Sequence, residues 1–170
     1  EAGEIRDIIF DFINIEEQNK MVKSKITKIN SDIKELKIGE AEESLNELGK
    51  MKSLKSYEKD YLEIKGKLKS AKLRLFDIDR SIKFEIEKVK ENIKKSEASK
   101  VGYVEKNKNL TKLYKESVDY LEKIILSHPY TTYRYDVNIL QSDIYAKLGM
   151  PNSAKNAMEE AKKYEGRRKE

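Results

Sequence analysis

The residues of this chain that could do chemistry are few and widely spaced. His128, the single histidine, precedes Pro129, and the sequence holds neither a cysteine nor a second histidine with which to build a zinc site or a nucleophilic triad. Asp77 and Asp79 are two residues apart, which places them on different sides of a helix and makes them a poor pair of general acid and base. No glycine-rich phosphate loop is present. We therefore expect no enzyme, no metal site and no cofactor.

A basic run of the kind that contacts phosphates lies at residues 65–74. It contains no acidic residue, and its members are Lys65, Lys67, Lys69, Lys72 and Arg74. Lys65, Lys69 and Lys72 share one face of a helix. Nucleic acid or an anionic surface is therefore one alternative partner, although the helix has no helix-turn-helix partner and no aromatic stacking platform. The preferred interpretation is the solvated face of a coiled coil.

Residue types that anchor protein interfaces gather between residues 128 and 135. They are His128, Pro129, Tyr130, Tyr133, Arg134 and Tyr135. Tyrosines at a helix junction can also pack between helices, which is the alternative for half of them. We take Tyr130, Tyr133 and Tyr135 as candidate protein-binding residues.

The composition indicates which elements must position these groups. Charged residues make up 39% of the 170 residues and hydrophobic residues 38%, with two prolines and no tryptophan, a balance that suits long two-faced helices. The formal net charge of +5 arises from 36 basic and 31 acidic residues, so the two signs nearly cancel. No apolar run approaches the roughly 20 residues of a membrane-spanning helix. The chain begins with Glu1, so we expect a processed or trimmed fragment, and the lack of cysteine leaves periplasm and cytoplasm both open.

Two long apolar runs in steps of three and four predict an antiparallel coiled-coil hairpin over residues 1–99. The first run has one polar member and comprises Ile8, Phe12, Ile15, Asn19, Val22, Ile26, Ile29, Ile33 and Leu36. The second comprises Leu54, Tyr57, Tyr61, Ile64, Leu68, Ala71, Leu75, Ile78, Ile82, Ile86, Val89 and Ile93. Gly39 is the expected end of the first helix. A short helix with a turn also fits the join, but we favour one continuous helix with a weak point at Gly49.

Three large apolar residues, Leu73, Phe76 and Phe84, lie off the second run and widen its apolar face. That surface is surplus in a two-helix hairpin, so we expect either a partner chain or the C-terminal helices of the same chain to cover it. A homodimer through the hairpin is one form of such a contact.

The small polar segment 96–102 predicts a boundary, followed by a second domain over residues 100–170. Its three helices are expected at 104–127, 132–148 and 152–165. Gly149 suits the turn between the last two, and Pro151 suits the first turn of the last helix. The predicted fold class is therefore all-α, a long helical hairpin followed by a small helical bundle.

The last helix pair resembles the tetratricopeptide repeat, a helical hairpin that holds other proteins. The residues that carry the resemblance are Ser142, Tyr145, Gly149, Ala154, Met158 and Ala161. Asn138 and Gln141 fall where the family usually has bulky apolar residues. Upstream residues look like the second half of a preceding repeat, so that the resemblance covers about one and a half repeats. These upstream residues are Ser117, Leu121, Ile124 and Pro129. In this resemblance, the inner helix presents to a bound segment the side chains of Asp136, Ile139, Leu140, Asp143 and Lys147.

The combination of such a repeat with an N-terminal coiled coil is similar to bacterial, and among them spirochaetal, periplasmic or envelope lipoproteins. The resemblance implies a non-enzymatic protein-protein interaction scaffold in the periplasm or envelope, which supports envelope integrity, division or host infection. Its partner would be another protein, such as an envelope protein. The alternatives are a structural spacer or homodimerisation arm and, further, a protein that binds nucleic acid or an anionic surface.

Overall fold

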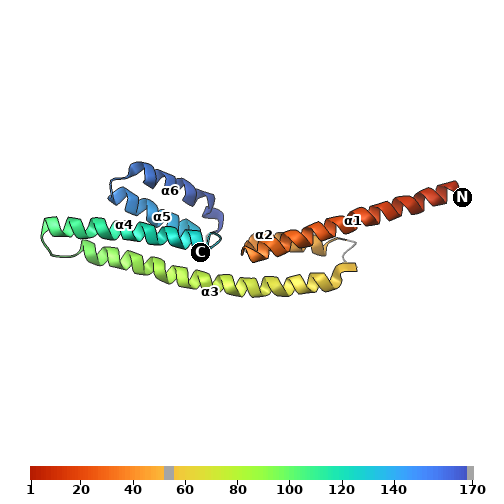
Figure 1. Cartoon of the computed structure of the whole chain (residues 1–170), viewed down its shortest axis with the longest axis horizontal. Helices are drawn as coiled ribbons and strands as arrows, with labels where there is room; N and C mark the ends of the chain where they lie inside the picture. The colour runs from red at the N-terminus through yellow and green to blue at the C-terminus, as the bar shows by residue number, and fades with distance from the viewer. Residues whose placement is uncertain (52–55, 168–170) are drawn as a thin grey trace. The chain divides into compact units, whose positions relative to one another are not determined.

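The computed structural model describes residues 1–51 and 56–167, and within them the regular structure is helical (Figure 1). This confirms the predicted all-α fold class. The elements are α1 (Ala2–Lys34), α2 (Ile38–Gly49), α3 (Glu58–Glu97), α4 (Tyr103–Ser127), α5 (Arg134–Lys147), α6 (Pro151–Lys163) and a 3-10 turn, η2 (Glu165–Arg167). Among the described residues, none of the helices is long and apolar enough to cross a membrane.

The chain forms two compact units, unit 1 (Glu1–Leu75) and unit 2 (Phe76–Glu170). Helix α3 contributes its first residues to unit 1 and the rest to unit 2. The boundary predicted at residues 99 and 100 falls in the turn that follows α3, between Glu97 and Tyr103. The compact units divide earlier because the apolar row of α3 from Ile82 onward is buried with residues of α4 and α5.

Unit 1 has its core between α1, α2 and the first part of α3. The buried members of this core are Val22, Ile29, Ala41, Leu45, Leu48, Ile64 and Leu68. In Figure 1, α1 and the beginning of α3 run in the same direction, and α2 runs in the opposite one. The antiparallel neighbour of α1 is therefore α2, rather than the second long helix that the apolar runs predicted.

The turn between α1 and α2 corrects the predicted end of the first helix. Leu36 has φ of +59°, and its N–H donates to the Ile33 carbonyl at 3.1 Å, while the N–H of Lys37 donates to the Asp32 carbonyl at 2.8 Å. This is the Schellman geometry that usually takes glycine, here made by a leucine. Gly39 is not the stop, because it lies inside α2.

The join after α2 also differs from the favoured prediction, because α2 ends at Gly49 and a continuous helix through this glycine is wrong. A Cβ at Gly49 would lie 3.1 Å from the Tyr61 hydroxyl oxygen, so that this close approach of α3 suits a residue without a side chain. Leu54, which begins the second predicted run, lies outside the described residues.

Unit 2 buries one core between the later part of α3, α4 and α5. Its largest fully buried members include Leu121, Val137 and Ile144. The three helices predicted for this region are confirmed, with ends that differ by at most two residues. Because the chain reverses direction at the ends of α3, α4 and α5, the apolar stripe of each helix reaches the same core.

The α5–α6 turn has the residues that the sequence assigned to it. Gly149 has φ of +71°, its N–H donates to the Ala146 carbonyl at 3.1 Å, and the N–H of Met150 donates to the Tyr145 carbonyl at 2.9 Å. Pro151 begins α6, where its missing N–H costs no hydrogen bond. Small residues bring the helices together, since the Ser142 hydroxyl donates to the Ala154 carbonyl at 2.8 Å.

Candidate protein-binding groove

The face of α5 predicted to meet a bound segment is only partly available. Leu140 is 7% exposed and belongs to the core of unit 2, so it does not reach a partner. Asp136 and Ile139 are half-buried, and Asp143 and Lys147 are exposed. The available part of this face is thus mostly polar.

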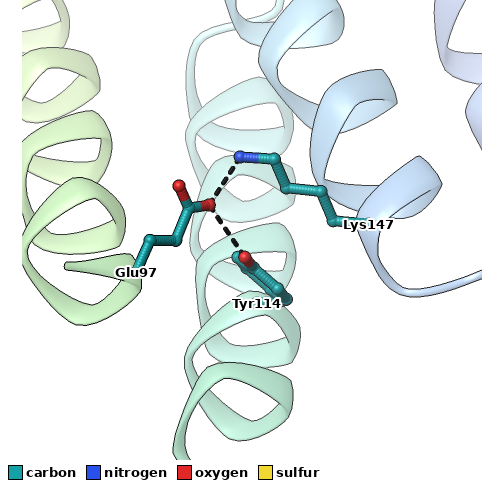
Figure 2. A network of polar contacts seen from close by, with 3 residues as sticks. All are labelled: Glu97, Tyr114 and Lys147. Atoms are coloured by element: carbon teal, nitrogen blue, oxygen red, sulfur yellow. Dashed lines mark hydrogen bonds and ion pairs between the residues drawn. The ribbon is translucent and has the colours of Figure 1, made fainter. Parts of the chain in front are cut away.

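Lys147 is engaged within the chain, in a network that Figure 2 shows. Glu97 Oε1, at the end of α3, accepts hydrogen bonds from Lys147 Nζ at 2.6 Å and from the Tyr114 hydroxyl at 2.8 Å. The hydrogen bond from Lys147 lowers the pKa of Glu97, and the bond from Tyr114 acts in the same direction. Burial, together with the nearby carboxylate, raises the pKa of Tyr114 to about 12. Lys147 therefore joins α5 to α3 and α4.

The predicted tyrosines Tyr130, Tyr133 and Tyr135 are all half-buried, and Tyr133 packs against the core. The loop between α4 and α5, which contains Tyr130 and Tyr133, is held in place by Asp79 of α3. From the sequence, Asp79 was considered only as a catalytic residue and was judged unsuitable. Asp79 Oδ1 accepts from the Thr131 hydroxyl at 2.5 Å and from the Thr132 N–H at 3.2 Å, and Oδ2 accepts from the Thr132 hydroxyl at 2.7 Å. Asp79 is 5% exposed, and all three of these hydrogen bonds fix the loop to α3.

Leu73, Phe76 and Phe84 are 63%, 58% and 65% exposed. For Phe76 and Phe84, which belong to unit 2, the alternative in which the C-terminal helices of the same chain cover them is wrong among the described residues. Each remains available to a partner, Leu73 in unit 1 and the two phenylalanines in unit 2.

The basic run on α3 has part of its charge matched within unit 1. Lys67 lies 3.7 Å from Glu63, one turn earlier, and Lys72 forms an ion pair with Glu42 of α2. Lys65 and Lys69 are exposed. Pairing with nearby acids weakens the case for phosphate binding by this run.

A polar groove lies on the opposite face of α5 from the predicted one, and the sequence analysis did not identify it as a site. Along α5, steps of four and three bring to the groove the side chains of Arg134, Asn138, Gln141 and Tyr145. Helices α4 and α6 complete the lining with Glu122, Ile125, Ser153, Asn156, Ala157 and Glu160. The groove has a volume of about 380 Å³ and is open to solvent.

Hydrogen bonds hold the polar side chains of the groove in place. Arg134 Nε donates to Asn138 Oδ1 at 3.2 Å, and its Nη1 donates to the Pro129 carbonyl at 3.1 Å. The same guanidinium lies over the Tyr164 ring, 4.6 Å from its centroid. The Gln141 amide donates to Glu122 Oε2 at 3.0 Å. The groove thus presents oriented donors and acceptors on a rigid helical base.

Both signs of charge line the groove. The hydrogen bond from Lys163 lowers the pKa of Glu160, and Arg134 adds to this effect. Burial raises the pKa of Tyr145, and the negative charges of Glu122 and Asp119 add to it, so that its hydroxyl stays protonated. The arrangement suits a polar ligand that carries both donors and acceptors, such as a peptide.

One signal in the sequence could have located this groove. Asn138 and Gln141 are two of the positions where the chain departs from the tetratricopeptide pattern, as does Gly166, and both amides line the groove. They are only 2% and 4% exposed, so each places an amide where an apolar side chain would ordinarily pack.

In comparisons with known proteins, no family model, no curated protein and no solved structure matches the chain.

Proposed function

We propose that this chain is a non-enzymatic interaction protein that holds a segment of another protein in the groove between α4, α5 and α6. The resemblance of α5 and α6 to a tetratricopeptide hairpin supports the same kind of activity. The single observation that carries the proposal is the pair of buried amides, Asn138 and Gln141, on the groove side of α5.

These amides are costly residues for a helix to bury. Burying an amide costs free energy unless it is hydrogen-bonded, and here each amide has a hydrogen bond to another residue of the groove, Asn138 with Arg134 and Gln141 with Glu122. Neither amide belongs to the hydrophobic core of unit 2, to which α5 contributes Val137, Leu140 and Ile144. Their value lies in recognition, since a buried amide can exchange a hydrogen bond within the chain for one to a bound backbone.

The expected ligand is an extended or helical peptide segment with a carboxylate and a donor group. Arg134 offers a planar guanidinium, which suits a carboxylate. Glu122 and Glu160 offer acceptors for an amide or an amine of the ligand. Affinity would come from contacts with Ile125, Tyr145 and Ala157, and specificity from the polar groups.

The test is photo-crosslinking in the source cell with a photoreactive residue at one position at a time. Asn156 is exposed and lines the groove, and Asp143 is exposed on the other face of α5, which makes it the matched control. We expect a defined crosslinked protein from position 156 and none from position 143. Crosslinks only from position 143 would place the partner on the face that the sequence predicted and would contradict the groove.

A double variant, Asn138→Leu with Gln141→Leu, tests the two amides themselves. It replaces them by side chains of similar size, so unit 2 should fold with equal or greater stability, whereas the crosslink from position 156 should disappear. Asp143→Ala, at an exposed position on the predicted face, should leave that crosslink in place. A crosslink that survives the leucine substitutions would overturn the role of the amides.

We place this activity in the periplasm or envelope of a bacterium, in a complex that supports envelope integrity, division or host infection. This follows from the resemblance to envelope lipoproteins with an N-terminal coiled coil. Identification of the crosslinked protein by mass spectrometry tests the placement, and a cytoplasmic partner would contradict it.

A further inference from the structure

The apolar run of α1 changes its surroundings halfway along the helix. Val22 and Ile29 are fully buried in the core of unit 1. Ile8, Phe12 and Ile15 continue the same steps of three and four but are 67%, 67% and 56% exposed. Further exposed large apolar residues on this half of the helix are Ile5, Ile9, Phe10 and Ile13. Figure 1 shows the same half of α1 extending with no other helix of unit 1 beside it.

The exposed half of α1 is strongly acidic. Among residues 1–17 there are six acidic side chains and one basic side chain, a formal side-chain charge of −5. The acidic members are Glu1, Glu4, Asp7, Asp11, Glu16 and Glu17, and the basic one is Arg6. Glu4, Asp11 and Glu16 lie at the positions that flank the apolar run. Two copies of this segment packed against each other would bring like charges together, so the segment suits a partner with basic flanks.

Unit 1 itself carries a surface of this kind, a hollow of about 420 Å³ between α2 and α3. Its lining contains the apolar Leu45 and Leu68, the lysines Lys65, Lys69 and Lys72, and also Asn46 and Glu42. Because Glu42 forms an ion pair with Lys72, the positive charge offered to a partner comes from Lys65 and Lys69. Exposed apolar residues of α3, Leu62 and Leu73, follow on the same side of the helix as Lys65 and Lys69. We call this surface, from Lys65 to Lys72 with Leu45, the basic hollow.

The acidic segment of α1 cannot reach the basic hollow of its own chain. Helix α1 is unbroken from Ala2 to Lys34, and its later half is fixed in the core by Val22 and Ile29. At a rise of about 1.5 Å per residue, the exposed segment begins about 20 Å along the helix axis from the packed half. A continuous helix cannot bend back over that length to reach α2 and α3. An acidic helix that enters the hollow would therefore belong to another molecule, and a second copy offers both the acidic segment and the hollow.

We propose that the exposed half of α1 docks in the basic hollow between α2 and α3 of a second copy, so that the protein self-associates through unit 1. The apolar side chains of α1, with Phe12 at their centre, cover the floor of the hollow, and the acids beside them meet its lysines. This contact does not involve the groove of unit 2, so its failure leaves the proposed function untouched.

The first measurement is the mass of the whole chain by sedimentation at several protein and salt concentrations. We expect concentration-dependent self-association whose dissociation constant rises roughly tenfold or more between low and high salt, because the contact joins opposite charges. A chain that stays monomeric at all concentrations up to about 1 mM, where even weak specific contacts are populated, would overturn the proposal.

Charge reversals identify the two surfaces. Glu4→Lys with Asp11→Lys should weaken self-association, and so should Lys65→Glu with Lys69→Glu. The four substitutions together should restore it, since the two surfaces exchange their signs. Lys108→Glu with Lys115→Glu, at exposed positions of α4 in unit 2, is the matched control for a change of the same charge and should have little effect.

Phe12→Asp tests the apolar part of the contact. Phe12 is 67% exposed, so the thermal unfolding of the chain should not change, while self-association should fall at least tenfold. If Phe12→Asp abolishes association but the reversals at Lys65 and Lys69 do not affect it, the two copies meet through α1 alone and the basic hollow is the wrong partner.

Discussion

Asp79 and Thr132 are joined by two hydrogen bonds, in which the Thr132 N–H donates to Oδ1 at 3.2 Å and the Thr132 hydroxyl donates to Oδ2 at 2.7 Å. The Thr131 hydroxyl donates a further hydrogen bond to Oδ1, so the Asp79 carboxylate accepts three hydrogen bonds from one loop. A residue of α3 thereby fixes the entry to α5, and with it the start of the polar row that lines the groove.

Asp79→Ala should lower the free energy of unfolding by about 2–4 kcal/mol, because it leaves the buried Thr131 hydroxyl and Thr132 N–H without their acceptor. Urea unfolding monitored by circular dichroism measures the change. Asp77→Ala, at an exposed position two residues earlier, is the control and should change stability by no more than about 0.5 kcal/mol. Equal effects of the two substitutions would show that the three hydrogen bonds contribute nothing net.

Glu97→Gln should lower stability at neutral pH and have no effect in acid. The hydrogen bond from Lys147 lowers the pKa of Glu97 below its ordinary 4.5, so the stabilisation is present above that value and is lost as the pH falls through the folded-state pKa. The difference in unfolding midpoint between wild type and variant should therefore shrink as the pH falls below 4.5. The effect is expected to be small, because the side chains of Glu97 and Lys147 are both more than one third exposed. A difference that grows in acid would contradict the network of Figure 2.

The same substitution, glycine to alanine, should have opposite effects at two positions. Gly149→Ala should destabilise unit 2 by about 1 kcal/mol, because φ of +71° is unfavourable for a residue with a Cβ. Gly66→Ala should stabilise α3 by about 0.5–1 kcal/mol, since Gly66 lies within the helix and a Cβ there meets nothing within 4 Å. Thermal unfolding of both variants gives the comparison, and a loss at Gly66 would show that its surroundings are tighter than described.

Asp32→Ala should raise stability by about 1 kcal/mol. Asp32 is 7% exposed, and its Oδ2 has no hydrogen-bond partner among the described residues. The carboxylate also lies near the C-terminal end of α1, where the helix dipole disfavours negative charge. Urea unfolding tests the change, and a clear loss of stability would mean that the buried oxygen has a favourable interaction in solution.

Most helices of this chain could be predicted from spacing alone. Apolar residues every three or four positions located α4, α5 and α6 to within two residues at each end, and Gly149 and Pro151 fixed the last turn. These features are local, because a helix end depends on residues only a few positions away.

The errors arose where the structure departs from ordinary preferences or depends on distant residues. Leu36 adopts a left-handed conformation that leucine rarely takes, so Gly39 was the expected but incorrect stop. The absence of a side chain at Gly49, where α2 ends, suits the approach of Tyr61 from another helix, since a Cβ there would lie 3.1 Å from the Tyr61 hydroxyl oxygen. Periodicity also cannot tell whether the partner of an apolar row belongs to the same molecule, which is why Ile8 and Val22 gave the same prediction but differ in exposure.

The candidate groove could be predicted only in part. The sequence located α5, but it favoured the face of Asp136 and Asp143 and treated Asn138 and Gln141 as departures from a pattern. Two amides on one face of α5 can either weaken its packing or line an open groove. The neighbouring helices α4 and α6 decide between these outcomes, and the sequence of α5 alone does not show how they lie.

The short turn at Gly149 has a consequence for folding kinetics. Only three residues separate α5 from α6, fewer than separate α3 from α4 or α4 from α5. The loss of chain entropy on bringing two consecutive helices together is therefore smallest for α5 and α6. We expect this pair to form early in refolding, before the more distant contact between Asp79 and the loop at Thr131 is made. Gly149→Ala should then slow refolding, whereas Asp79→Ala should mainly accelerate unfolding.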